Sequence, residues 1–143
     1  MPPETSHLIH LLSTPLRRHS RVAGTPTTID VTDPDPNNGT FNEPFDDIED
    51  CDRVVSPGDT CIIKDTSASY SGTALNASGT SGNPITYQCA GSNPDITSQI
   101  SANASHIWIL GCAFNTVSGV RTIRANSGDI YGWRIAGNTF QTA

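Results

Sequence analysis

The chain has 143 residues, of which 35% are apolar and 15% are charged, and its formal net charge is −6 at pH 7. This length fits one domain that buries about two-thirds of its unfolded surface, and its many Ser, Thr, Asn and Gly residues exclude a helical bundle. The negative charge argues against nucleic acid as a partner, and no apolar segment is long enough to cross a membrane.

Residues 1–28 are predicted to form a leader, separate from a domain over residues 29–143. The apolar run of the leader, residues 8–12, is short, and the basic cluster over residues 17–21 follows it. A secretory signal has the opposite order, so we predict none here. Two interpretations stay open: a poorly ordered terminal arm, or an arm that a neighbouring chain holds in place.

Acidic residues are concentrated in one part of the chain, where eleven of the fourteen lie between Asp30 and Asp65. Within it, the run DPDPN over residues 33–37 is similar to the start of a calcium-binding loop. The Gly and the final Glu of such a loop would fall on Asn38 and Pro44, so the pattern fails at its most demanding positions. We predict no cofactor, with calcium at this run as the alternative.

Residues 44–54 are predicted to form a short helix that covers the first strands as a lid. Asp46 and Asp47 lie near its start, where carboxylates accept from free N–H groups and complement the helix dipole. Ile48 and Cys51 are three residues apart, so both can face the same way. Such a lid covers strand edges that would otherwise be exposed.

Strand-like segments recur along the rest of the chain. SHIWILGCAF, from Ser105, and YGWRIAGNTF, from Tyr131, align at a step of 26 residues, and earlier alignments follow at steps of 22 and 24. Alternation along each segment directs one set of side chains inward. The predicted inner file is Ile63, Tyr87, Ile109 and Ile135, and a parallel file is Cys61, Ile85, Ile107 and Trp133.

A second column of strands repeats at a similar step. Residues 100–103 and 123–126 align at a step of 23 residues, and both end in Ala-Asn; residues 76–78 fit the same turn one repeat earlier. No two-residue hairpin turn occurs at these spacings. The sequence therefore predicts an all-β fold, a parallel β-helix (solenoid) of about four coils of some 24 residues, with strands stacked at about 4.8 Å.

Three segments carry a resemblance to a known superfamily: TTIDVTDPDPNNGTFNEPFDDIED from Thr27, VSPGDTCIIKDTSASYSGT from Val55 and SGTSGNPITYQC from Ser78. Together they resemble the N-terminal coils of right-handed parallel β-helix proteins of the pectate-lyase and chondroitinase-B type. The resemblance implies a right-handed helix, with a capping helix before a first coil that Pro-Gly-Asp-Thr opens. Residues 66–70 depart from the pattern, because they are longer and lack its Gly.

The resemblance also implies where catalysis would lie. Lyases of this superfamily use a Lys or Arg base beside carboxylates that hold calcium, on the outward faces of middle coils. The middle coils of this chain carry no pair of carboxylates, Lys64 and Asp65 lie on the first coil, and His106 is isolated. No active site can be assembled, so the sequence leans against an enzyme.

The four cysteines can form two pairs. Cys51 on the lid and Cys61 on the first strand are ten residues apart, and Cys89 and Cys112 are 23 apart, nearly one coil. Adjacent coils place Cα atoms within the range that a disulfide needs; buried, unlinked thiols are the alternative. No CxxC motif favours zinc. An even number of pairable cysteines favours an oxidising location, outside the cell or at its surface.

Three sequons for N-glycosylation begin at Asn38, Asn76 and Asn103. For Asn76 and Asn103 the alternative is an asparagine ladder, in which each side chain bonds the next turn. Asn126 continues this column without being part of a sequon, which favours the ladder. Asn38 is then the better candidate for carrying a glycan.

A candidate carbohydrate-binding pair lies on the outside of the first strand column. The outward positions are predicted to be Ile62, Thr86, Trp108 and Arg134. Trp108 with Arg134 one coil away can stack on a sugar ring, or the two can form a cation–π pair that covers the strand.

Only three residues follow Phe140, so we expect the last coil to be uncovered and to act as a template for further strands. A head-to-tail contact at this end would repeat without closing and give a filament. The function predicted is an extracellular structural β-helix that binds copies of itself and binds or carries polysaccharide. The alternative is an N-terminal fragment of a polysaccharide lyase.

Overall fold

A computed structural model of the chain describes residues 24, 26–29, 38–40, 42, 44–65, 68–91, 95–116, 119, 121–126 and 129–142. Strands dominate these residues, and all pairs between them are parallel. The prediction of an all-β chain with parallel sheets is confirmed at this level. The apolar run and basic cluster of the predicted leader, and the DPDPN run, lie outside the described residues.

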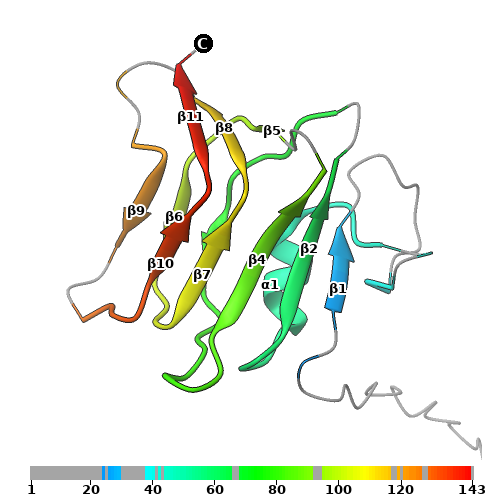
Figure 1. Cartoon of the computed structure of the whole chain (residues 1–143), viewed down its shortest axis with the longest axis vertical. Coiled ribbons are helices and arrows are strands. Elements are labelled where there is room, and N and C mark those ends of the chain that lie inside the picture. Colours follow the sequence, from blue (N-terminus) through cyan, green and yellow to red (C-terminus); the bar gives the residue numbers. More distant parts are fainter. Residues whose placement is uncertain are drawn as a thin grey trace, which may run out of the picture.

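Three sheets contain the strands, as Figure 1 shows. The five-stranded sheet has the order β1-β2-β4-β7-β10, with bounds Pro26–Ile29, Thr60–Lys64, Ile85–Ala90, Ile107–Leu110 and Arg134–Ala136. A second sheet has the order β11-β8-β5, with bounds Thr139–Thr142, Ala113–Thr116 and Asp95–Ile96. The third has the order β3-β6-β9, with bounds Ala74–Leu75, Ile100–Ala102 and Ile123–Ala125.

The chain visits these sheets in a fixed order. From β4 onward it enters the five-stranded sheet, then the β5-containing sheet, then the β3-containing sheet, and it repeats this order from β7 and again from β10. We call each such passage a pass. Each strand pairs with its counterpart in the next pass, so the stacking of passes, and not of sequence neighbours, creates the hydrogen-bonded ladders.

The register confirms two predicted steps and corrects one. Ile85 pairs with Ile107, and Ile109 pairs with Ile135, at the predicted steps of 22 and 26 residues. Tyr87, however, pairs with Cys61 at a step of 26 residues, not with Ile63 at 24. Because side chains alternate with a period of two, a slip of two residues leaves the same set facing inward. Alternation therefore predicted the correct face but not the register.

The same slip changes the predicted outward file of the five-stranded sheet. Thr60, and not Ile62, lies beside Thr86, and Trp108 and Arg134 follow in register. Ile62 lies beside Gln88 in a neighbouring file. The second predicted column is correct, since Ile100 pairs with Ile123 in the β3-β6-β9 sheet.

The core lies between the three sheets and draws apolar side chains from each. The buried residues with the largest side chains include Tyr87 and Ile109 from the five-stranded sheet, Phe114 from β8, and Ile100 from β6. The Phe114 ring stacks on Phe140 with 5.3 Å between centroids. Trp133 packs at the edge of this core, as predicted, and its Nε1 donates to the Ala104 carbonyl at 2.8 Å. Alternate burial along β2, β4 and β7 therefore fills one shared interior.

Two stacked glycines form the corner between the five-stranded sheet and the β5-containing sheet. Gly111 follows β7 with φ +69°, and Gly137 follows β10 with φ +66°. Residues with a Cβ are strained in this left-handed region, so glycine is the residue that turns the chain here at low cost. This explains why both glycines appeared at the same place in the sequence repeat.

The helix α1 spans Ile48–Val54 and is shorter than the predicted 44–54. Asp47 is its N-cap residue, and its Oδ1 accepts from the Asp50 N–H at 2.7 Å. An N-cap residue has non-helical backbone angles, so the helix begins after it. The predicted placement of a carboxylate at the helix start is therefore confirmed, and the predicted first residue is wrong.

Gly72 tests how closely two passes approach. A Cβ added there would lie 2.5 Å from the Ser98 carbonyl oxygen and closer still to that of Gln99, both backbone atoms of the next pass. Gly72→Ala should lower the free energy of unfolding by about 1–3 kcal/mol, measured by chemical denaturation. Gly82→Ala is the control, because a Cβ there meets no atom within 4 Å; equal destabilisation by both changes would contradict the close approach.

Candidate functional site

The strands of the last pass carry apolar side chains that earlier passes bury. Ile135 and Phe140 are 43% and 54% exposed, whereas their register partners Ile109 and Phe114 are each 1% exposed. β10 and β11 also lie at the edges of their sheets among the described residues. We call this surface the open end. It combines free backbone groups with uncovered core positions, which is the combination that accepts another strand.

The helix α1 covers the opposite side of the core. Ile48 and Cys51 are buried on it, as predicted from their spacing, and α1 contacts β1, β2 and β3. Cys51 forms a disulfide with Cys61 of β2, with 6.4 Å between Cα atoms. We call α1 with β1 and β2 the capped end. The cross-link holds the cap covalently to the first strand that it covers.

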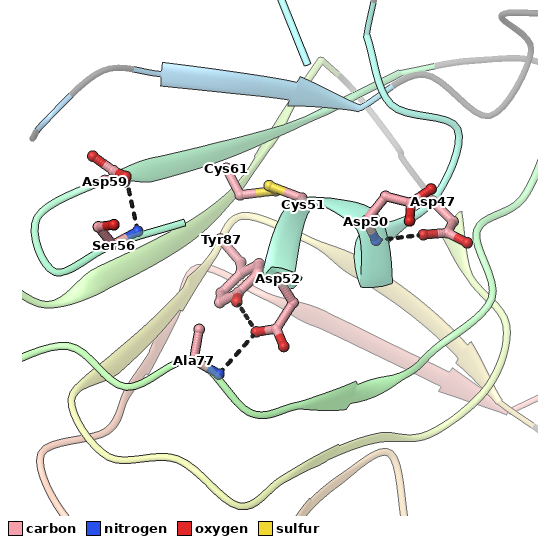
Figure 2. Close-up of a disulfide and its surroundings, with 9 residues drawn as sticks. All are labelled: Asp47, Asp50, Cys51, Asp52, Ser56, Asp59, Cys61, Ala77 and Tyr87. Atoms are coloured by element: carbon pink, nitrogen blue, oxygen red, sulfur yellow. Dashed lines mark hydrogen bonds between the residues drawn. A yellow bond between two sulfur atoms is a disulfide. The ribbon is translucent and has the colours of Figure 1, made fainter. Parts of the chain in front are cut away.

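A buried carboxylate adds a second attachment for the cap. Figure 2 shows Asp52, on α1, between the Tyr87 ring and the turn at Ala77. Its Oδ1 accepts from the Tyr87 hydroxyl at 2.5 Å and from the Ala77 N–H at 3.3 Å, and its Oδ2 accepts from the Asn76 N–H at 2.9 Å. A buried charge is stable only when its lone pairs are satisfied, and here three donors satisfy it. Asp52 thereby joins α1 to two successive passes.

The surroundings of Tyr87 favour its neutral form. Burial raises the pKa of the Tyr87 hydroxyl strongly, and the negative charge of Asp52 together with their hydrogen bond raises it further. Ionising this hydroxyl would place two negative charges 2.5 Å apart and remove the donor that Asp52 needs. The pair is therefore a fixed structural contact rather than a titrating site at neutral pH.

Asp59 forms a second buried junction at the capped end. Its Oδ2 accepts from the Ser56 N–H at 2.8 Å, and its Oδ1 accepts from the Gly24 N–H at 2.7 Å. The first bond fixes the Pro-Gly-Asp-Thr turn, and the second reaches the residue two before β1. Asp59 therefore helps to position β1 beside β2.

The surface of the capped end is acidic. The carboxylates of Asp46, Asp47 and Asp50 lie within 4.8 Å of one another. Partial burial and the neighbouring charge of Asp47 raise the pKa of Asp50, against the lowering effect of Arg53. Arg53 also pairs with Glu49 at 2.5 Å. This group offers negative charge to solvent.

Basic side chains lie on the last passes. Arg121, Arg124 and Arg134 are all exposed. The Cζ of Arg134 lies 5.1 Å from the centroid of the Trp108 ring, so the structure brings the predicted carbohydrate-binding pair together as a cation–π pair. The guanidinium covers a ring face on which a sugar would stack.

The second predicted disulfide also forms and crosses between passes. Cys89 at β4 and Cys112 before β8 are linked, with 5.0 Å between Cα atoms. All four cysteines are therefore paired as predicted. Two disulfides are typical of proteins in an oxidising environment.

The asparagine ladder is present. Asn103 Nδ2 donates to Asn76 Oδ1 at 3.0 Å, and Asn76 Nδ2 donates to the Ala74 carbonyl at 2.9 Å. The amide nitrogens of both sequon residues are thus engaged within the fold. Asn38 is exposed, and its Oδ1 accepts from the Thr40 N–H at 3.0 Å. Use of these sequons stays a prediction.

No protein-family model, no curated protein and no solved structure matches this chain. The resemblance to the β-helix superfamily therefore stays a prediction. Among the residues that the structure describes, no helix has the length and apolar character to span a bilayer.

Sequence reasoning missed the role of Asp52, although the pattern contained a signal. Ile48, Cys51, Asp52 and Val55 follow the i, i+3, i+4, i+7 spacing of a buried helix face. A carboxylate within such a stripe requires dedicated donors. The donors, at Tyr87 and the Asn76 turn, lie 24 to 35 residues away in sequence, so spacing alone did not reveal them.

Removing the charge of Asp52 should loosen the cap. In Asp52→Asn, the new amide nitrogen opposes N–H donors, and we expect a loss of about 2–3 kcal/mol in the free energy of unfolding, measured by urea denaturation. Glu49→Gln, on the exposed face of the same helix, is the matched control and should change stability far less. A variant of Asp52 as stable as this control would show that the network contributes little.

Tyr87 should make the fold sensitive to alkaline pH. Its folded-state pKa is raised, so its contribution is complete below the unfolded pKa of about 10 and is lost as pH rises, because only the unfolded state releases the proton. Stability should fall by about 1.4 kcal/mol per pH unit above about pH 10 from this group. The stability gap between the native chain and Tyr87→Phe should be constant from about pH 6 to 9 and narrow above about pH 10; a constant gap throughout would contradict the assignment.

Proposed function

We propose that this chain is a right-handed parallel β-helix that serves as an extracellular structural module and self-associates end to end. Three parallel sheets, visited in a repeating order around one core, support the helix. Chirality rules for parallel crossover connections favour the right-handed form. The two disulfides support an oxidising, extracellular location.

Exposure of Ile135 and Phe140 at the open end is the observation that carries the proposal. Each is an inner-file side chain without a following pass over it among the described residues. Fully burying one such side chain is worth about 1.5–3 kcal/mol, and both are already partly covered. Their burial alone cannot give a tight complex, so free strand edges must contribute as well.

The strand edges favour a head-to-tail arrangement of copies. β1 and β10 occupy the two edges of the five-stranded sheet, and all of its strands are parallel. Placing β1 of one copy beside β10 of another continues the sheet with the same polarity. Such a heterologous contact leaves both outer edges free again, so repeated addition yields a filament rather than a closed oligomer.

Polar substitution at the open end should abolish self-association. We expect the native chain to form oligomers whose size grows with concentration in sedimentation velocity. Ile135→Asp combined with Phe140→Asp should weaken association at least about tenfold, because each loses apolar burial and buries a charge. Ala90→Asp, at an exposed site on β4, is the control and should assemble like the native chain.

Circular dichroism must show a native strand signal for both variants before their assembly is compared. A native chain that stays monomeric over a wide concentration range would refute the proposed function. Unchanged assembly of the double variant would show that association uses another surface.

A further inference from the structure

We infer that the open end recognises the acidic capped end of a second copy by charge, so that electrostatics orders the copies head to tail. This inference rests on the proposed function and identifies the partner surface of the same site. The partner is a second copy of this chain. The distribution of charge along the stack of strands supports this recognition.

The two ends carry opposite charge. Residues 44–65 contain seven carboxylates against Arg53 and Lys64, a formal net charge of −5. Residues 119–142 contain three arginines against one carboxylate, Asp129, a formal net charge of +2. At the capped end Asp46 and Glu49 are exposed, and all three arginines are exposed near the open end. Solvent-facing charge of opposite sign is thus placed where two copies would meet.

The ends are too far apart to neutralise one another within one molecule. β1 and β10 are separated by four strand spacings, about 19 Å at about 4.8 Å each, and Figure 1 shows them at opposite edges of the sheet. The Debye length at physiological ionic strength is about 8 Å. Each end therefore presents its own field to solvent, and its nearest complement is the other end of another copy.

Charge supplies the direction that apolar contact lacks. Two open ends could bury Ile135 and Phe140 against each other, but this would bring arginines of like sign together and reverse strand polarity. Joining the open end to the capped end pairs opposite charges and keeps every strand parallel. Apolar burial then contributes the affinity, and charge contributes the choice of partner surface and the rate of encounter.

A charge exchange between two variants tests the inference. One variant carries Arg121→Glu, Arg124→Glu and Arg134→Glu, which makes its open end acidic like its capped end. The other carries Asp46→Arg and Glu49→Arg, which adds basic charge to its capped end opposite a basic open end. Asp47 and Asp52 are left unchanged, because they cap and anchor α1.

Each variant alone should associate at least about tenfold more slowly than the native chain at low salt, because its own ends repel. An equal mixture should associate at close to the native rate, since each end then meets its complement on the other variant. Light scattering during concentration jumps measures these rates, and circular dichroism confirms that both variants fold. Addition of about 0.5 M salt should slow the native chain and remove most of the difference between samples.

Failure of the inference and failure of the proposed function give different results. If the native chain assembles and each variant alone assembles equally fast, charge does not select the partner end, and the inference is overturned while self-association stands. If both variants assemble slowly and their mixture is no faster, the charges do not face each other, and the inference is again overturned. A native chain that never assembles refutes the proposed function itself.

Discussion

In-register parallel pairing between successive passes is the constraint on which the rest of the structure depends. Each strand finds its partner 22 to 27 residues away, so no pass can bond its strands without the next. The Asn76–Asn103 bond and the Cys89–Cys112 link add side-chain and covalent ties across the same step. A structure of this kind is stable in its middle and has a problem at each end, where a pass lacks a neighbour.

The two ends meet that problem differently. At the capped end, α1 supplies apolar cover through Ile48, a disulfide through Cys51, and a buried acceptor through Asp52. At the open end, the described residues show no comparable cover over Ile135 and Phe140. Because only one end is finished, the surfaces differ in shape, polarity and charge. This asymmetry, rather than any single residue, leads to the proposal of directional assembly.

How much of this could be predicted from sequence depended on the range of the signal. Alternation predicted the inward face of every matched strand, and equal apolar types aligned Ile85 with Ile107 correctly. The partner of Tyr87 was placed two residues from Cys61, because a period of two does not fix register and the connecting loops differ in length. Asp52 was missed because its donors are separated from it in sequence. Interactions between passes set register and buried polar contacts, and a single sequence encodes them only weakly.

X-ray diffraction from oriented assemblies of the native chain tests the central claim most directly. If copies continue the strand stack end to end, strands lie across the filament, and a reflection near 4.8 Å must appear along its axis. The same spacing found perpendicular to the axis, or compact closed oligomers in place of filaments, would contradict head-to-tail continuation of the sheets.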